Sequence, residues 1–298
     1  MVGALFKQLR PRQWAKNVLL FAGVIFAREA LQPRLWGRAA LGFVAFSLVS
    51  SAVYVLNDWL DRERDRLHPE KRFRPIASGR IGPAGAAALF VLLLAGAAAL
   101  SAPLGPTFVL CAGAYLGLHT LYSVGLKQVL ILDVLCLASG FVLRAIAGVE
   151  VLRPVQPDIA ISPWLEVCTF FGALFLGAIK RRQELSLVEE GSRRHVLREY
   201  SVPLLEDVIL ISAAATLFSY ALYTIAPATV EKFHTEALVF TIPFVVYGIF
   251  RYLYLTRSHA KGENPTEVLL RDRPILVNGA LWLLVVALII YGRGFGRP

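Results

Sequence analysis

Runs of about 20 mostly apolar residues recur along the whole chain, and a membrane-spanning helix needs a run of that length. Soluble proteins average about 25% charged and about 45–50% apolar residues. This chain of 298 residues has 17% charged and 56% hydrophobic residues, so its extra apolar surface must face lipid. The same composition excludes a disordered chain and a nucleic-acid-binding tail, although the net charge is +10.

The apolar runs predict nine spans, and therefore an all-α integral membrane protein with residues 1–298 in a single polytopic domain. The first span is weak, because the run from Asn17 to Ala27 is short unless its helix begins near Trp14 and continues past Arg28. Pro103-Leu-Gly-Pro106 divides the uncharged stretch over residues 81–126 into spans three and four. The remaining six cover residues 39–56, 128–148, 159–179, 208–226, 237–253 and 275–291.

Positive charges predict the orientation of these spans. Counted from the N-terminus, 23 of the 31 Lys and Arg residues lie in alternate connections, 7 lie in the others, and Arg144 lies within a span. Cytoplasmic loops carry such an excess. We therefore expect a multi-pass protein of the cell membrane whose N-terminus, with loops 57–80 and 180–200, is cytoplasmic.

Acidic side chains gather where span two reaches the cytoplasm. Asn57, Asp58, Asp61 and Asp65 are spaced three and four residues apart, which places all four on one face of a helix. Their oxygen atoms suit a hard cation such as Mg²⁺, which takes one or two carboxylates together with water and phosphate oxygens. The alternative is a solvated helix end whose acids pair with Arg62, Arg64 and Arg66.

The next loop adds bases to these acids. Lys71, Arg72 and Arg74 lie among Pro and Gly residues that shape the connection, and acids beside bases indicate a clamp for a metal and a diphosphate. The alternative is the ordinary positive charge of a cytoplasmic loop. His68 is interpreted as a structural or phosphate-contacting residue rather than as a general base.

Two charged residues lie within span five. Asp133 and Arg144 fall on one stripe of this helix, about 16 Å apart, and ionisable groups at depth face the bundle interior or a wet cavity. They are therefore candidates for the site, although each could also form a structural ion pair with another helix.

The sequence Asn57-Asp58-x-x-Asp61-x-x-x-Asp65, followed by Arg74-Pro-Ile-Ala-Ser-Gly79, resembles the first aspartate-rich motif of the UbiA superfamily of intramembrane prenyltransferases. This resemblance implies a nine-helix bundle with a cytoplasmic active-site mouth. Several other segments resemble its decaprenyl-phosphate phosphoribosyltransferase branch: Arg10-Pro-Arg-Gln-Trp-Ala-Lys16-Asn17, His68-Pro69, Tyr122-Ser-Val-Gly-Leu-Lys127, Arg144-Ala-Ile-Ala-Gly148 and Lys180-Arg-Arg-Gln-Glu184-Leu.

One departure from the superfamily pattern concerns the end of span six, where aromatic prenyltransferases carry a second Asp-x-x-x-Asp motif. Here Lys180, Arg181 and Glu184 stand in that region. Lys180 and Glu184 could form an intrahelical pair. The added positive charge favours two substrates that both carry phosphate.

The resemblance implies an enzyme that transfers 5-phosphoribosyl from 5-phosphoribosyl 1-diphosphate (PRPP) to a long-chain polyprenyl phosphate of the decaprenyl type, releasing diphosphate, in the synthesis of cell-wall arabinan precursors. Mg²⁺ bound by Asp58 and Asp61, with Asp65 as a further candidate ligand, would stabilise the leaving group. Membrane lipids are expected partners, nucleic acid is not, and a homo-oligomer is compatible with the sequence. The candidate substrate-binding residues are Lys16, Asn57, Lys71, Arg72, Arg74, Tyr122, Lys127, Asp133, Arg144, Lys180, Arg181 and Glu184.

Two alternatives remain open on the sequence. An aromatic or quinone-pathway prenyltransferase would keep the metal clamp but ionise a prenyl diphosphate. A transporter or lipid-binding scaffold would explain Asp133 and Arg144, but it would not need three carboxylates in register beside a basic loop.

Overall fold

The computed structural model describes residues 2–25, 32–159, 162–187, 195–258 and 271–292. Every regular element within these ranges is a helix. The chain divides into two compact units, residues 1–160 and 161–298, and each is described by itself. The single domain expected from the sequence stays a prediction.

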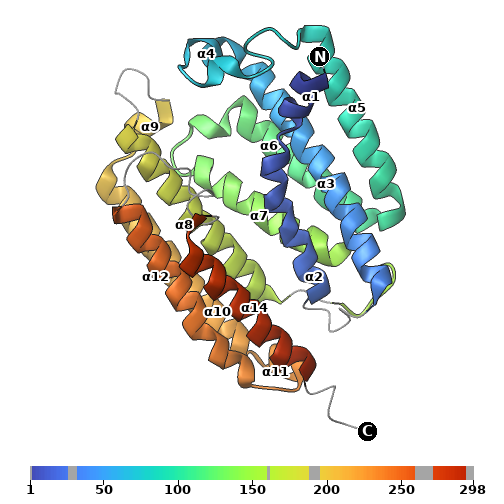
Figure 1. Cartoon of the computed structure of the whole chain (residues 1–298), viewed down its shortest axis with the longest axis vertical. Coiled ribbons are helices and arrows are strands. Elements are labelled where there is room, and N and C mark those ends of the chain that lie inside the picture. Colours follow the sequence, from blue (N-terminus) through green and yellow to red (C-terminus); the bar gives the residue numbers. More distant parts are fainter. Residues whose placement is uncertain (1, 26–31, 160–161, 188–194, 259–270, 293–298) are drawn as a thin grey trace. The chain divides into compact units, whose positions relative to one another are not determined.

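The first unit contains seven α-helices among its described residues, shown from blue to green in Figure 1. Short 3₁₀ helices connect or precede several of them. The α-helices are α1 (Val2–Leu9), α2 (Ala22–Ile25), α3 (Pro33–Leu60), α4 (Arg62–Leu67), α5 (Pro83–Ser101), α6 (Pro106–Val124) and α7 (Leu132–Glu150). The 3₁₀ helices are η1 (Pro11–Phe21), η2 (Lys71–Phe73), η3 (Ala102–Leu104) and η4 (Leu126–Gln128).

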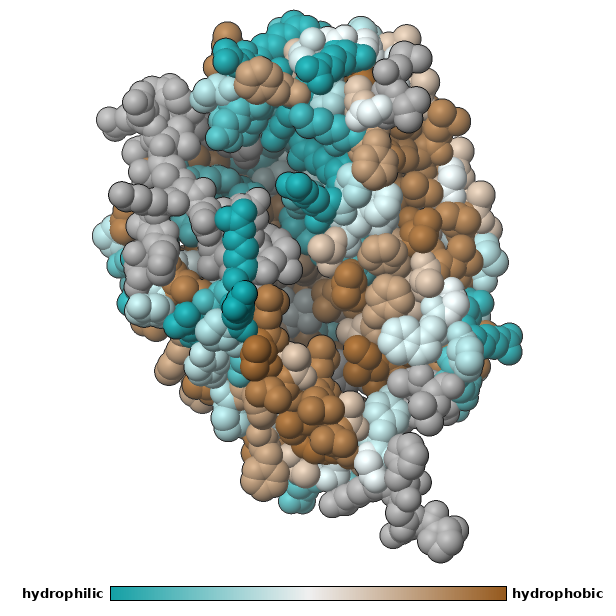
Figure 2. All heavy atoms as spheres, in the orientation of Figure 1, coloured by the Kyte–Doolittle hydropathy of each residue, from teal (hydrophilic) through white to brown (hydrophobic). Residues whose placement is uncertain are grey.

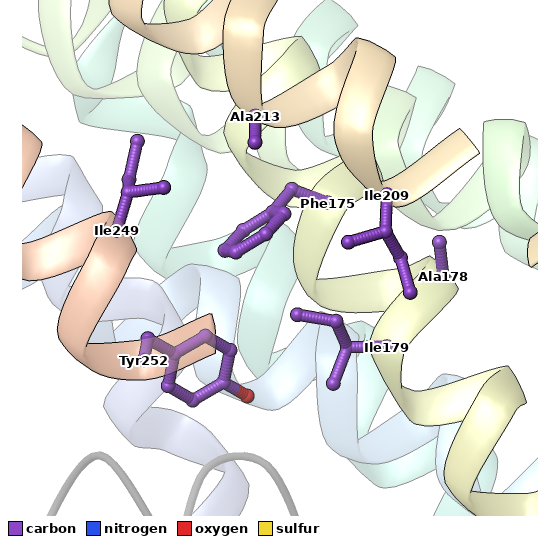
Figure 3. Close-up of a cluster of buried hydrophobic side chains, with 7 residues drawn as sticks. All are labelled: Phe175, Ala178, Ile179, Ile209, Ala213, Ile249 and Tyr252. Atoms are coloured by element: carbon purple, nitrogen blue, oxygen red, sulfur yellow. The ribbon is translucent and has the colours of Figure 1, made fainter. Parts of the chain in front are cut away.

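The second unit is also helical throughout its described residues. Its elements are α8 (Pro163–Leu187), α9 (His195–Glu199), α10 (Val202–Ile225), α11 (Pro227–Phe233), η6 (Ala237–Thr241), α12 (Ile242–Ser258) and α14 (Arg273–Tyr291). Its core lies where α8, α10 and α12 meet. Figure 3 shows the ring of Phe175 of α8 pointing toward Ile249 and Tyr252 of α12, with Ile209 and Ala213 of α10 in the same cluster.

Eight helical stretches of the described residues are long and apolar enough to cross a membrane. They correspond to spans two to nine of the sequence prediction. The turn expected between spans three and four is present: Gly105, with φ of 109°, separates η3 from α6, and a Cβ there would meet Pro154 at 2.9 Å. Hydrophobic side chains cover the α5 side of the unit in Figure 2, whereas hydrophilic ones gather over the end that carries α4.

Only part of the expected first span is described. Residues 11–25 form the 3₁₀ helix η1 and the short helix α2, and residues 26–31 lie outside the described part of the chain. The first span, and with it the total of nine, therefore stays a prediction. The chain enters η1 through Arg10, whose φ of 52° is left-handed, and Pro11 at the first position fixes the start of the helix.

Two glycines set how closely this N-terminal segment packs on α7. A Cβ on Gly23 would collide with the carbonyl group of Gly148, and a Cβ on Gly148 would collide with the backbone of Leu20. The side chain of Asn17 then donates to Ser47 Oγ of α3 at 3.0 Å. The close backbone packing on α7 and the hydrogen bond to α3 together fix η1 between these two helices. Lys16 is part of η1.

Candidate active site

The acidic sequence of span two lies at a break between two helices. Helix α3 ends at Leu60, α4 begins at Arg62, and Asp61 between them has φ of −92° and ψ of 1°. The backbone still follows helical spacing, because Asp61 N donates to Asn57 O at 2.9 Å and Asp65 N donates to Asp61 O at 2.8 Å. The four side chains expected on one face are therefore close in space, but the break divides their partners into two groups.

Asp58 is the centre of the first group, and its side chain is 2% exposed. Arg10 Nη2 donates to both carboxylate oxygens at 2.6 and 2.8 Å, and Gln8 Nε2 donates at 2.8 Å. Arg74 Nη1 donates to Asp58 at 3.0 Å and to Asp65 at 2.6 Å. Two carboxylates and two guanidinium groups thus compensate one another, which fixes the basic loop against the N-terminus.

Asp61 forms a separate group with Lys127 of η4 and Asn57. Lys127 Nζ lies 2.8 and 2.9 Å from the carboxylate oxygens of Asp61 and 3.3 Å from Asn57 Oδ1. The Lys127 side chain is 6% exposed and that of Asp61 is 15% exposed, the highest value among the three aspartates. Asp61 is therefore the most accessible carboxylate of the cluster, and it already faces a cation.

Arg62, Arg64 and Arg66 do not pair with the aspartates in the described structure. Arg62 Nε and Arg66 Nη1 instead donate to Glu63, whose side chain is 66% exposed, and Arg66 Nε also donates to the carbonyl oxygen of Ala77. These exposed pairs add little to stability. They lower the pKa of Glu63, chiefly through the hydrogen bond from Arg62.

The loop after α4 is organised by His68. Its Nδ1 accepts hydrogen bonds from the backbone N–H groups of Glu70 and Lys71 at 3.2 and 3.3 Å. Partial burial, and then the charge of Lys71, lower the pKa of His68, so the imidazole is favoured in its neutral, accepting form. These bonds support the structural interpretation of His68. Arg72 is exposed and its guanidinium lies 4.8 Å from the ring of Phe73, so the described contacts do not bring it to the aspartates.

The two predicted residues of span five are both buried in α7. Asp133 is fully buried in the first turn of α7, and Arg144 is 4% exposed. Arg144 donates to neutral acceptors, Asn17 Oδ1 at 2.8 Å and the hydroxyl group of Tyr115 at 2.6 Å. No carboxylate of the described residues forms an ion pair with Arg144, so the alternative of a structural ion pair with another helix is not present there. Tyr122 of α6 lies one turn from His119, and their ring centroids are 6.2 Å apart.

The basic end of span six belongs to the second unit. Arg181 Nη1 binds Glu184 Oε2 at 2.6 Å, and Lys180 Nζ lies 4.0 Å from Glu184 Oε1, as the spacing suggested. Arg181 is 2% exposed, whereas the Lys180 side chain is 47% exposed. Part of the second predicted loop, residues 188–194, lies outside the described residues.

The oxygens around Lys127 show which residues could hold a metal ion. Among the described residues, no three His, Cys, Asp or Glu side chains gather closely enough to form a metal site. Asn57 and Asp61 nevertheless surround a cationic atom with three oxygens. Because Mg²⁺ usually takes one or two carboxylates and completes its shell with water and phosphate, this pair fits it in ligand type. The saturated oxygens of Asp58 fit it less well.

Sequence reasoning did not single out Gln8 or Arg10 as site residues, although both donate to Asp58. Arg10 did stand in the N-terminal segment that supported the resemblance. The pairing itself joins residues 48 positions apart, which no local spacing could indicate.

A model of the UbiA prenyltransferase family matches residues 18–270 of the chain. The decaprenyl-phosphate phosphoribosyltransferase of Mycolicibacterium smegmatis is 34% identical over 98% of this chain and 93% of its own length. That of Corynebacterium glutamicum is 34% identical over 98% of this chain and 88% of its own. That of Mycobacterium tuberculosis is 33% identical, with 98% and 96% covered.

Solved structures support the fold. A UbiA homologue from Archaeoglobus fulgidus bound to GPP and Mg²⁺ superposes with a TM-score of 0.71, at 20% identity, over 96% of this chain and 99% of that chain. A UbiA homologue from Aeropyrum pernix gives a TM-score of 0.65 at 18% identity, with 96% and 97% covered. At these identities the similarity concerns the architecture alone.

Proposed function

Because this chain belongs to the UbiA prenyltransferase family, we propose that it transfers the 5-phosphoribosyl group of PRPP to a long-chain polyprenyl phosphate and releases diphosphate. The observation that carries the proposal is the identity of 33–34% to curated decaprenyl-phosphate phosphoribosyltransferases over 98% of the chain. A decaprenyl-type acceptor and a place in cell-wall arabinan synthesis belong to the same proposal.

The charges of the first unit support substrates that carry phosphate. Lys127, Arg74 and Arg10 all lie at the acidic mouth, and each is held by a carboxylate in the structure. A diphosphate arriving at Asn57 and Asp61 would compete for these cations, since charge-assisted hydrogen bonds to phosphate and carboxylate are similar in kind. We assign Lys127 and Arg74 to the leaving diphosphate, with Lys71 and the exposed Arg72 as further donors of the same loop.

Mg²⁺ held by Asn57 and Asp61 would neutralise the charge that develops on the departing diphosphate. The protein's own contribution is then to position the ribosyl carbon against the acceptor oxygen. The acceptor phosphate is already an anion, so no general base is required. This agrees with His68, whose Nδ1 is occupied by two backbone N–H groups.

We place the active site on the cytoplasmic side of the cell membrane, with nine spans in all. The support is the bias of 23 of 31 Lys and Arg residues toward one set of connections, which includes the acidic mouth. The isoprenoid tail of the acceptor would lie among the apolar helices. Lys180 and Arg181 of α8 are proposed to contact a phosphate of the donor, and Asp133 and Tyr122 to line the site of the first unit.

The second candidate function is an aromatic or quinone-pathway prenyltransferase of the same family. The basic sequence at Lys180 and Arg181, where such enzymes carry acids, argues against it.

One experiment separates the two enzymes. Membranes containing the full chain are incubated with labelled PRPP plus polyprenyl phosphate, and separately with labelled prenyl diphosphate plus an aromatic acceptor. We expect label in the lipid fraction only from PRPP, with Mg²⁺ required. Label entering lipid only from the prenyl diphosphate would replace the proposed function by the second candidate, and no transfer in either arm would favour a non-enzymatic role.

A further inference from the structure

Two positive charges of the first unit, those of Lys16 and Arg144, lie within electrostatic reach of each other. The Lys16 ammonium of η1 and the Arg144 guanidinium of α7 repel each other, and Arg10 adds to the repulsion at Lys16. Arg10 is compensated by Asp58, but Lys16 and Arg144 have no carboxylate partner among the described residues. Such a pair in an apolar bundle is unfavourable unless an anion compensates it.

Donor groups in this pair remain available. Arg144 has five N–H donors, and its three hydrogen bonds, to Asn17, Gly140 and Tyr115, engage one donor each. Lys16 has three donors. No hydrogen bond or ion pair joins its ammonium to any residue in the described part of the chain.

A third polar group in the same place is independently unsatisfied. His119 of α6 is 7% exposed, and its Nε2 has no hydrogen-bond partner among the described residues. Both Arg144 and Lys16 are within electrostatic reach of this imidazole. The imidazole of His119 fits beside α7 because residue 140 is glycine, since a Cβ at Gly140 would lie 2.5 Å from His119 Nε2. A buried polar atom without a partner needs a ligand or a water molecule.

We propose that Lys16, Arg144 and His119 form a second anion site, next to the acidic mouth, that binds a phosphate monoester group. The inference rests on the proposed function, which supplies two such groups: the phosphate of the polyprenyl acceptor and the 5-phosphate of the ribosyl donor. Tyr54, which interacts electrostatically with Arg144, precedes Asp61 on α3 by seven residues, or about 10 Å. A phosphate at the second site would thus lie deeper than a diphosphate at the mouth, and it would fix the other end of a substrate.

The test measures binding of two probes, ribose 5-phosphate and polyprenyl phosphate, to the full chain in detergent, with polyprenol as the lipid that lacks phosphate. Lys16→Gln removes the charge without breaking a hydrogen bond to a described residue, so the variant should fold. We expect this variant to bind one of the two phosphate probes about 10- to 100-fold more weakly, the usual effect of losing a charge-assisted contact. Lys16→Arg should retain most of the affinity, and polyprenol binding should not change.

The matched control is Lys7→Gln, which removes the same charge from an exposed position of α1 and should leave both probes unaffected. Loss of polyprenyl phosphate binding in Lys16→Gln assigns the site to the lipid, and loss of ribose 5-phosphate binding assigns it to the donor. Unchanged binding of both probes, or an equal loss in Lys7→Gln, overturns the second site.

Labelled transfer by the wild-type chain is measured in parallel. If the wild type transfers no phosphoribosyl group but still binds a phosphate probe through Lys16, the second site stands and the proposed function falls. If the wild type transfers label while Lys16→Gln binds both probes normally, only the second site falls.

Discussion

Asp58 and Asp61 should respond differently to the same substitution, because the structure gives them different partners. In Asp58→Asn, the guanidinium groups of Arg10 and Arg74 would face a neutral amide. Because the side chain at this position is only 2% exposed, water could not replace the lost negative charge. Breaking a buried ion pair costs about 3–5 kcal/mol. The two arginines are 23% and 25% exposed, so water screens their charges in part. We therefore expect a loss of stability at the lower end of this range. About 3 kcal/mol corresponds to a fall in Tm of about 6–12 °C for a unit of this size.

Asp61→Asn should have the opposite pattern. Asp61 is 15% exposed and has one cationic partner, Lys127, so we expect less than half the loss of Tm seen in Asp58→Asn. Diphosphate release should fall by at least about 100-fold, the effect of removing one group that stabilises a developing charge. Asp61→Asn would therefore be folded and inactive, whereas Asp58→Asn would be destabilised and retain residual, Mg²⁺-dependent activity at low temperature.

The assay combines thermal unfolding in detergent with diphosphate release from PRPP at several Mg²⁺ concentrations. Glu63→Gln is the control, because it makes the same chemical change at an exposed acid of the same segment and should alter neither quantity. The reasoning is refuted if Asp58→Asn unfolds at the wild-type Tm but is inactive, since Asp58 would then act on the substrate or metal directly. Normal turnover in Asp61→Asn would refute the proposal that Asp61 holds Mg²⁺.

Gly148→Ala should lower Tm by several degrees, because its Cβ would collide with the backbone of Leu20; an unchanged Tm would show that η1 can move away from α7. The folded pKa of His68 is lowered, so the unfolded chain binds its proton more readily, and the loop should lose stability as pH falls through about 6.5. Hydrogen exchange of residues 70 and 71 should show this acid-induced loss in the wild type but not in His68→Gln. Lys180→Ala and Arg181→Ala should raise the apparent KM for PRPP by about 10- to 100-fold and leave the apparent KM for polyprenyl phosphate unchanged, as measured by steady-state kinetics. A rise in the KM for polyprenyl phosphate alone would assign both residues to the acceptor.

Apolar length and proline placement were enough to predict most of the helices. A span needs a fixed number of apolar residues, and Pro33, Pro83 and Pro106 begin helices because proline fits the first turn. The turn at Gly105 was predictable for the same reason. The 3₁₀ geometry of η1 was not predictable, because contacts with α3 and α7 hold this segment in place.

The partners of the acidic residues could not be predicted from their spacing. Helical periodicity correctly placed Asn57, Asp58, Asp61 and Asp65 together, because it depends only on the local backbone. It says nothing about which cations approach from elsewhere in the chain. Arg10 arrives from 48 residues before Asp58 and Lys127 from 66 residues after Asp61, and these two long-range contacts separate the cluster into an anchored part and an accessible part.

The contact between Leu20 and Gly148 sets an order of events during biosynthesis. The two residues are separated by 128 positions in the chain, and ribosomes add about 5–20 residues per second, so the N-terminal segment waits about 6–25 s before α7 exists to receive it. Asn17 can bond Ser47 of α3 early in that interval, but its second partner, Arg144, is synthesised only near the end of it. Translation speed, or a chaperone of membrane insertion, would thus influence how much of this protein reaches its folded state.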